Sequence, residues 1–564
     1  MRFEPVSIAV WLKTAKNPPL EKLVEASLAF SGVPDTSLAV YTEKMDRIIT
    51  EVKTRFKGRE KTKELADELL VFLHEKYLKR YSENETLINT LLDKGLYNCV
   101  SSAVFYMLAA HALDISVSGV LTSSHAFCLV TIDGKQFDVE TTSKYGFDPH
   151  GKREFLDEFG TQTGYVYVPP TNYRDRTTIG QIHLLTLILN NRIALAGTKA
   201  KLDEAFSAAV DMFEVLQSDE AFRTLSGTLS NISLDAVKRK KYEDGLEVMD
   251  KAVFAFREFP ELAEVRRLYI LDWAGGLVNA NKPDDAEEVA LRMVATGKIS
   301  QDDLHILQMY IAFKRAEIIS KKGEHHTALE IIEEAIKTLG STDELQHART
   351  TYTKNTVIEY ITKKDYPASR TLLDEAQKTG VLDKRAYEEL LVYYYLKKAE
   401  DPAKQKLFRD AVEVLNKGLK YLPKNNKLFK AGAAYAYNHA AGLLREKRFD
   451  EAEEFLSDVN LTPYMELSKR NELWVYFYTE KASIEKTENG YFPAARILHQ
   501  GIMKLGKLSQ LVKTYEIYIH NGVVSLIDDK RFGDAEKVLI DAIAVLPASS
   551  TLKKDLETVR RMMQ

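Results

Sequence analysis

The sequence predicts an α+β domain at the N-terminus followed by an all-α array of helical hairpins, so the chain is expected to be mostly helical. Three observations predict this fold class. The 564 residues are more than a single hydrophobic core usually holds. The 27 Gly and 15 Pro residues are fewer than average, which favours long helices over sandwiches or barrels. Small residues also recur every 40 to 42 positions from Ala205 onward.

Charge and cysteine content narrow the classes of partner and site. The 78 basic and 82 acidic residues give a net charge of −4, without the basic excess that is typical of nucleic-acid binding. We therefore expect no nucleic-acid partner. The 2 Cys residues exclude a disulfide framework and a multi-cysteine zinc site. No cofactor and no metal ion are expected.

Apolar segments give no indication of a membrane protein. The longest mostly apolar run extends from Val100 to Leu113, whereas a membrane span needs about twenty residues. This run is expected to be a buried helix. Residues 1–13 lack the pattern of a signal peptide. We therefore expect a cytoplasmic protein, with a trimmed secreted or periplasmic form as the open alternative.

Residues 1–178 do not share the repeat and are expected to form the N-terminal domain. Apolar residues at helical spacing predict amphipathic helices at 20–30, 38–56 and 65–77. The pattern changes at residue 115, and β-rich segments then predict strands at 117–121, 126–132 and 136–139. Asp133-Gly134, between the last two strands, is a strong hairpin signal. Helices followed by an antiparallel meander indicate an α+β domain, which we expect to be joined to the array by Pro169-Pro170-Thr171-Asn172.

Residue types suited to nucleophilic catalysis occur in order within this domain. Cys99 begins the apolar helix, where the helix dipole and free amide N–H groups favour a thiolate. His125 opens the second strand and can accept the thiol proton. A carboxylate on the third strand, Asp138 or Glu140, can fix the imidazole tautomer. The sequence therefore predicts a catalytic triad of cysteine, histidine and an acid.

Strand pairing bears on which carboxylate completes the triad. A tight two-residue turn pairs Ile132 with Lys135. Glu140 then lies diagonal to His125, with roughly 7 to 8 Å between the backbones, and Asp138 lies two residues further away. We therefore favour Glu140. A longer turn or a bulge would favour Asp138 instead.

These residues resemble the core motifs of the transglutaminase-like (papain-like thiol) superfamily, over about residues 60–150. The family reads Gly-x-Cys at a helix start, His-Ala-Trp on the next strand and Asp-Pro-Thr on the third. This chain has Tyr97-Asn98-Cys99, His125-Ala126-Phe127 and Glu140-Thr141-Thr142 at these places. The resemblance implies that Cys99 is the nucleophile and His125 the base. Cys128, on the opposite face of its strand, is expected to lie in the core.

A regular period predicts the helical array. Each repeat has a small anchor residue on its second helix and a small or β-branched residue twelve positions earlier, on its first helix. Small residues at both positions let two antiparallel helices approach closely. The anchors are Ala205, Gly245, Ala286, Ala328, Ser369, Ala411, Ala452, Ala494 and Ala535, and the residues twelve positions earlier are Ile193, Ser233, Ala274, Ala316, Val357, Ala399, Ala440, Ala482 and Val523.

With an aromatic residue three positions before several anchors, as at Phe408 and Phe449, the repeats resemble the tetratricopeptide repeat (TPR) family. The resemblance covers residues 179–564, although the repeat of about 41–42 residues is longer than the family's 34. It implies nine TPR-like hairpins stacked in a superhelical solenoid that binds a protein or peptide. Aromatic residues on first helices, such as Tyr393, Trp474 and Tyr476, are candidates for its groove.

Two functional hypotheses follow. In the first, the chain is a cysteine-dependent hydrolase or acyl transferase: Cys99 attacks a peptide or amide carbonyl, and the repeats recruit the substrate. In the second, it is a non-catalytic protein-interaction scaffold with a vestigial triad, because such domains also persist as inactive binding folds. Protease, transglutaminase and deamidase activities stay open, since they share an acyl-enzyme and differ in the nucleophile that resolves it.

Overall fold

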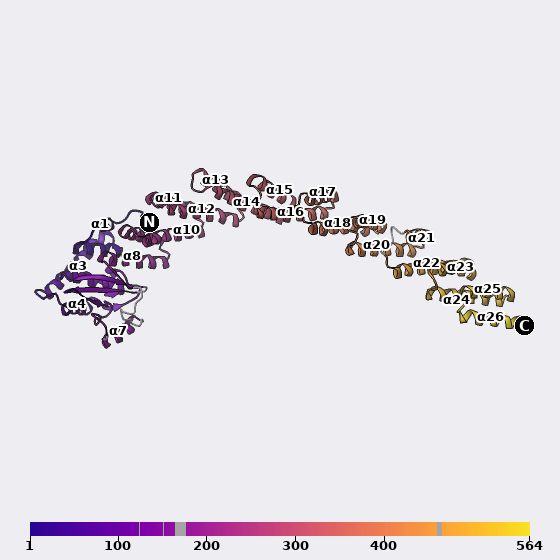
Figure 1. Cartoon of the computed structure of the whole chain (residues 1–564), viewed down its shortest axis with the longest axis horizontal. Coiled ribbons are helices and arrows are strands. Elements are labelled where there is room, and N and C mark those ends of the chain that lie inside the picture. Colours follow the sequence, from indigo (N-terminus) through magenta and orange to yellow (C-terminus); the bar gives the residue numbers. More distant parts are fainter. Residues whose placement is uncertain (123–124, 151, 164–175, 459–464) are drawn as a thin grey trace. The chain divides into compact units, whose positions relative to one another are not determined.

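A computed structural model describes residues 1–122, 125–150, 152–163, 176–458 and 465–564 of the chain. These residues form two compact units, Met1–Ile311 and Ala312–Gln564, whose helices and strands are labelled in Figure 1 where there is room. The first unit joins the predicted N-terminal domain to the first helical hairpins, so the compact units do not divide at residue 178. The expected linker, Pro169-Pro170-Thr171-Asn172, lies outside the described residues. Within the described ranges, no helix has both the length and the apolar character needed to cross a bilayer.

The helices before the array follow the predicted apolar patterns. The predicted segments at 20–30, 38–56 and 65–77 correspond to α2, α3 and α4, and the apolar run corresponds to α6, which is buried from Val100 to Ala110. The shorter helices α1, α5 and α7 were not predicted. The bounds are α1 Ser7–Leu12, α2 Leu20–Phe30, α3 Asp35–Arg55, α4 Lys63–Lys76, α5 Ile88–Lys94, α6 Cys99–His111 and α7 Arg153–Thr163.

An antiparallel sheet contains the three predicted strands. Its strand order is β5-β4-β3-β6, and β6 at the edge was not predicted. Asp133 and Gly134 both have positive φ, as a two-residue hairpin turn requires, and Ile132 pairs with Lys135 as expected. The bounds are β3 Ser116–Leu121, β4 Ala126–Ile132, β5 Lys135–Val139 and β6 Thr177–Ile179, while β1 Arg80–Tyr81 and β2 Leu96–Tyr97 form a small parallel pair.

Helix α6 packs against β3 and β4 of this sheet. Alternate residues of a strand point to opposite faces. Cys128 and Val130 of β4 accordingly belong to the core that includes α6, whereas Phe127 and Leu129 form a separate apolar cluster with Val120. This packing brings the N-terminus of α6 and the beginning of β4 into one region of the domain.

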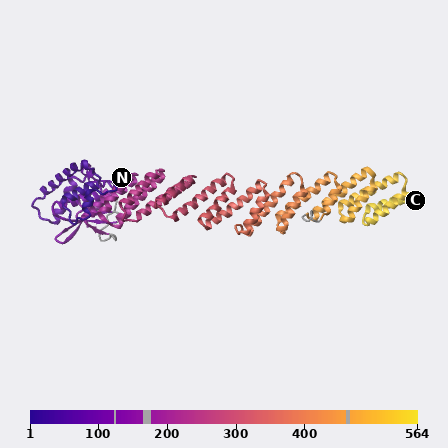
Figure 2. The ribbon, with the colours of Figure 1, turned by 90° about the horizontal axis from the view of Figure 1, so that it is seen from above.

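From α8 onward, consecutive helices within each unit pack as antiparallel hairpins, such as α8 with α9 and α22 with α23, and α26 is the last helix (Figure 2). The first unit holds α8 Gln181–Thr198, α9 Leu202–Leu216, α10 Asp219–Lys238, α11 Tyr242–Ala255, α12 Glu261–Asn279, α13 Pro283–Ala295 and the first half of α14 Gln301–Lys321. The second unit holds the rest of α14, α15 His325–Leu339, α16 Asp343–Thr362, α17 Tyr366–Lys378, α18 Lys384–Lys404, α19 Phe408–Tyr421, α20 Asn426–Arg445, α21 Phe449–Ser457, α22 Leu467–Asn489, α23 Tyr491–Leu505, α24 Ser509–Asp528, α25 Phe532–Val545 and α26 Ser550–Met563.

The predicted small residues lie where paired helices meet. All nine anchors are buried, and the Ser369 hydroxyl donates a hydrogen bond to the carbonyl of Val357, its predicted counterpart on the first helix, over 3.3 Å. At Gly245 a Cβ atom would lie 2.2 Å from the hydroxyl oxygen of Tyr269. Close approach of the helices therefore excludes any larger residue at this anchor unless the tyrosine moves.

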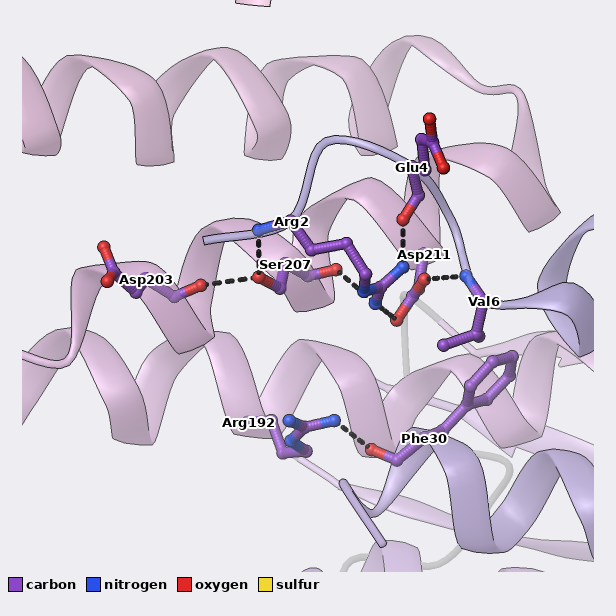
Figure 3. A network of polar contacts seen from close by, with 8 residues as sticks. All are labelled: Arg2, Glu4, Val6, Phe30, Arg192, Asp203, Ser207 and Asp211. Carbon is purple, nitrogen blue, oxygen red and sulfur yellow. Dashed lines mark hydrogen bonds and ion pairs between the residues drawn. The ribbon is translucent and has the colours of Figure 1, made fainter. Parts of the chain in front are cut away.

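The first hairpin is fastened to the beginning of the chain by a buried carboxylate (Figure 3). Asp211 of α9 is 2% exposed. Its Oδ2 accepts a hydrogen bond from the Arg2 guanidinium at 2.6 Å, and its Oδ1 accepts one from the Val6 amide at 2.9 Å. On α8, Arg192 donates to the carbonyl of Phe30 at 2.8 Å. A buried charge needs such partners, so α8 and α9 are integral to the fold of the N-terminal domain.

The turns within the hairpins have a repeated geometry that the sequence analysis missed. The first helix of most hairpins ends at a residue with positive φ, and the next amide donates back to the carbonyl five residues earlier, as Lys241 does to Ala236 over 2.9 Å. This is the Schellman motif. Glycine is its usual residue, whereas here lysine is frequent, so glycine does not mark most of these turns. The residues with positive φ are Ala200, Lys240, Asn281, Gly323, Lys364, Lys406, Lys447 and Lys530.

We expect Lys447→Gly to stabilise the hairpin of α20 and α21 by about 1 kcal/mol, because glycine adopts the left-handed conformation without a Cβ clash. Amide hydrogen exchange from these two helices is then about fivefold slower. Lys447→Ala is the matched control, since alanine keeps the Cβ atom and leaves exchange unchanged. Equal effects of the two substitutions would contradict the steric explanation.

Candidate active site

Cys99 is the first residue of α6, and the preceding residue explains why the helix begins there. The side-chain oxygen of Asn98 accepts hydrogen bonds from the amides of Val100 and Ser101, both at 3.0 Å, and the Ser101 hydroxyl accepts one from the Asn98 amide at 2.9 Å. This capping box fixes the first turn. Cys99 is partly exposed, and its amide belongs to the first turn, where N–H groups have no partner within the helix.

His125 lies just before β4 and is bonded to Glu140. The distance from His125 Nε2 to Glu140 Oε2 is 2.6 Å, and the side chains are 15% and 3% exposed. The imidazole also stacks on Phe127, with 6.1 Å between ring centroids, and meets the edge of Phe159 at 5.9 Å. The backbone is held as well, because the Thr122 amide donates to the His125 carbonyl at 2.9 Å.

Glu140 follows β5 directly and is oriented by its own loop. Its Oε1 accepts a hydrogen bond from the Thr142 hydroxyl at 2.9 Å, which leaves Oε2 directed at His125. The Glu140 amide donates to the carbonyl of Gly146 at 2.7 Å. A Cβ atom at Gly146 would lie 1.9 Å from the carbonyl oxygen of Glu140, so this close approach of the loop requires glycine.

Asp138, the other predicted candidate for the third member, has a different partner. Its carboxylate binds Arg176 through both oxygens, at 2.9 and 2.5 Å. The Arg176 guanidinium also lies over the Phe127 ring, 5.4 Å from its centroid. The structure thus brings Glu140 to His125 and pairs Asp138 with an arginine.

The electrostatic environment of His125 favours the imidazolium. Burial lowers the pKa of His125, but the charge of Glu140 and hydrogen bonds with Cys99 and Glu140 outweigh this effect and hold the pKa well above its usual value. Cys128, in contrast, is fully buried and its thiol donates to the carbonyl of Ala103 at 3.3 Å. Burial raises the pKa of Cys128. Cys99 is thus partly exposed, whereas Cys128 lies in the core, as expected for Cys128 from the sequence.

Three further residues support the loop behind Glu140, and two of them, His74 and Ser102, were not singled out from the sequence. His74 Nε2 donates to the carbonyl of Thr141 at 3.0 Å, the Ser102 and Thr141 hydroxyls are 2.8 Å apart, and the Tyr97 hydroxyl donates to the carbonyl of Thr142 at 3.2 Å. Burial lowers the pKa of His74 to about 4, despite the opposing effect of the Thr141 carbonyl. His74 comes from α4, and no sequence pattern links it to this loop.

The aromatic residues expected in a repeat groove differ in exposure. Trp474 is buried, Tyr393 is half-buried and Tyr476 is 42% exposed. Exposed apolar residues recur at one repeat position, six residues before the small residue of the first helix. They are Leu268 and Tyr310 in the first unit and Tyr476 and Ile517 in the second. As for metal ions, the described ranges contain no group of three or more His, Cys, Asp or Glu residues that could hold one.

Comparisons with known proteins give matches to solved structures only. No family model matches the chain, and no curated protein matches it. The TPR domain of P58(IPK) is 12% identical over 67% of this chain and 98% of its own, with a TM-score of 0.14. A monomeric mutant of IFIT1 with Gppp-AAAA is 13% identical over 98% and 96% of the two chains, with a TM-score of 0.17. Yeast Tom70 is 13% identical over 67% and 88%, with a TM-score of 0.14. At such low TM-scores, the hairpin architecture rests on the helices and contacts described above.

We expect Glu140→Gln to lower the pKa of His125, because glutamine keeps the shape of the side chain and removes the charge that opposes the effect of burial. An NMR titration with histidine-selective labelling measures this shift. Asp138→Asn is the control and leaves the pKa of His125 unchanged. If the pKa of His125 falls in Asp138→Asn and not in Glu140→Gln, then Asp138, and not Glu140, is the carboxylate that stabilises the imidazolium.

The raised pKa of His125 also has a consequence for stability. The folded pKa exceeds the unfolded value of about 6.5. Protonated His125 therefore contributes stability that is fully present below the unfolded value and is lost as the pH rises through the folded pKa. At pH values below the unfolded pKa, we expect the wild type to unfold at a higher temperature than Glu140→Gln. This difference in unfolding temperature decreases as the pH rises through the folded pKa of His125. A constant difference at all pH values would contradict the linkage.

Proposed function

We propose that this chain is a cysteine-dependent acyl transferase or hydrolase whose helical array binds a protein or peptide substrate. The observation that carries the proposal is the 2.6 Å hydrogen bond from His125 to the buried Glu140, together with the interaction with Cys99 that helps to raise the pKa of His125. A buried carboxylate that orients an imidazole, which in turn contacts a thiol at a helix N-terminus, is the arrangement that activates a cysteine nucleophile.

The chemistry is a two-step acyl transfer. His125 takes the proton of the Cys99 thiol, and the thiolate attacks an amide carbonyl carbon of the substrate. The C–N bond breaks as His125 donates the proton to the leaving amine, and an acyl thioester is left on Cys99. Water or a second amine then attacks the thioester carbonyl carbon and gives a proton to His125, and the C–S bond breaks to release the acyl product and the Cys99 thiolate. The Cys99 amide, at the N-terminus of α6, is positioned to stabilise the oxyanion.

The alternative is a protein-interaction scaffold in which the triad is vestigial. The array favours this function, because stacked helical hairpins provide extended binding surfaces. Both functions include binding by the array. They differ only in whether Cys99 reacts.

Alkylation tests the activation of the thiol in a Cys128→Ala background, where Cys99 is the remaining cysteine. We expect iodoacetamide to alkylate Cys99 about tenfold more slowly in His125→Ala, because the imidazole no longer accepts the thiol proton. The rate is measured by intact mass at neutral pH. His111→Ala, at the other end of α6, is the matched control. Equal rates in wild type and His125→Ala would favour the scaffold.

Product analysis tests the reaction itself. Casein is incubated with the full chain and a fluorescent primary amine, and the release of peptides, the release of ammonia and the incorporation of the amine are measured. We expect one of these products from wild type and none from Cys99→Ala. The three products distinguish protease, deamidase and transferase activity. A product that persists in Cys99→Ala would contradict the assignment of Cys99 as the nucleophile.

A further inference from the structure

A cavity of about 620 Å³ lies between the edge of the sheet and the first helices of the array. Strands β3 and β6 form one side, and α8, α9 and α10 form the other. Helix α8 contributes His183, Thr186, Leu187 and Asn190, a spacing that puts all four on one face of the helix. The first two hairpins are thus walls of a cavity in the N-terminal region.

Two series of contacts connect this cavity to the candidate active site. Thr122 lines the cavity, and both its amide and its hydroxyl donate to the His125 carbonyl, at 2.9 and 3.1 Å. Thr122, in the cavity wall, therefore holds the backbone of His125 directly.

The second series reaches the N-terminus of α6. Asn191, next to the lining residue Asn190, donates to the Thr86 hydroxyl at 3.1 Å. The neighbouring carbonyl of Glu85 accepts a hydrogen bond from the Ser101 hydroxyl in the first turn of α6, at 2.9 Å. The cavity therefore contacts the backbone of His125 through Thr122, and α8, which lines the cavity, also binds the loop that holds the first turn of α6.

The lining of the cavity has a definite chemical character. Apolar side chains are contributed by Leu121, Ile179, Leu187, Met212 and Leu216. Glu220 is the one carboxylate among the described lining residues, which include no lysine or arginine. Burial lowers the pKa of His183, although Glu220 opposes the shift. The cavity therefore has an acidic side chain, Glu220, beside an apolar wall.

We infer that this cavity is the substrate subsite of the proposed acyl-transfer centre and takes a peptide segment that carries an apolar side chain followed by a basic one. The apolar side chain packs against α8 and α9, and the basic group pairs with Glu220. An acidic segment is disfavoured, because its charge would face Glu220 without a compensating cation. The inference rests on the proposed function, since it assigns the cavity to the reaction of Cys99.

The test compares two alkylating dipeptides on the full chain in the Cys128→Ala background. Chloroacetyl-Leu-Lys-amide and chloroacetyl-Leu-Glu-amide carry the same reactive group with opposite charge. At low ionic strength we expect the lysine reagent to alkylate Cys99 about fivefold faster than the glutamate reagent. The lysine side chain forms a partly exposed ion pair with Glu220, whereas the glutamate side chain is repelled by it. Glu220→Lys reverses this preference. Asp219→Lys, a neighbouring charge change that does not line the cavity, is the matched control and leaves the preference unchanged.

A second variant tests the cavity independently of charge. Thr224→Tyr fills part of the space beside Glu220 and is expected to slow both dipeptide reagents about fivefold, while leaving the rate with iodoacetamide unchanged. Equal rates for the two dipeptides in wild type, or a preference that survives Glu220→Lys, would overturn the subsite. Iodoacetamide rates that do not depend on His125 would instead overturn the proposed function.

Discussion

Helix α8 is surrounded by other parts of the chain, and the first compact unit depends on this burial. Six consecutive residues, Leu184–Leu189, are buried, which in a helix means that every face is covered. Helices α2 and α6 and strand β3 pack against it, as does its hairpin partner α9. The N-terminal domain and the first hairpin therefore share one core. For this reason the compact unit extends to Ile311 and does not end where the repeats begin.

Polar contacts reinforce this shared core at its margin. Asp211 is buried and accepts hydrogen bonds from Arg2 and from the Val6 amide, while Arg192 reaches back to Phe30. Hydrogen bonds to charged groups contribute about 1.5–3 kcal/mol each, and leaving either partner unpaired in the interior is destabilising. The contacts join residues that are far apart in the sequence. They therefore hold the first hairpin in the orientation that shapes the cavity beside the His125 turn.

Local patterns explain what could be predicted from the sequence. Small anchors such as Ala411 repeat because two helices meet there, and the turn at Asp133 and Gly134 fixes the register of the hairpin. Both features are set by residues close together in the chain. The lysines with positive φ at the ends of the first helices were missed because lysine is not the usual residue for the left-handed conformation. His74 and Thr142 were missed because their roles depend on contacts between distant segments, which no spacing in one sequence reveals.

The loop at 140–142 shows how one carboxylate determines the charge of the candidate site. His74 and His125 both contact this loop, and burial lowers the pKa of each. His74 faces a neutral carbonyl, so the effect of burial prevails and the imidazole is uncharged at neutral pH. His125 faces Glu140, so attraction prevails and the imidazolium is favoured. A neutral histidine can support the loop without adding a second positive charge near His125. The two histidines that contact this loop therefore differ in charge because one faces a carbonyl and the other a carboxylate.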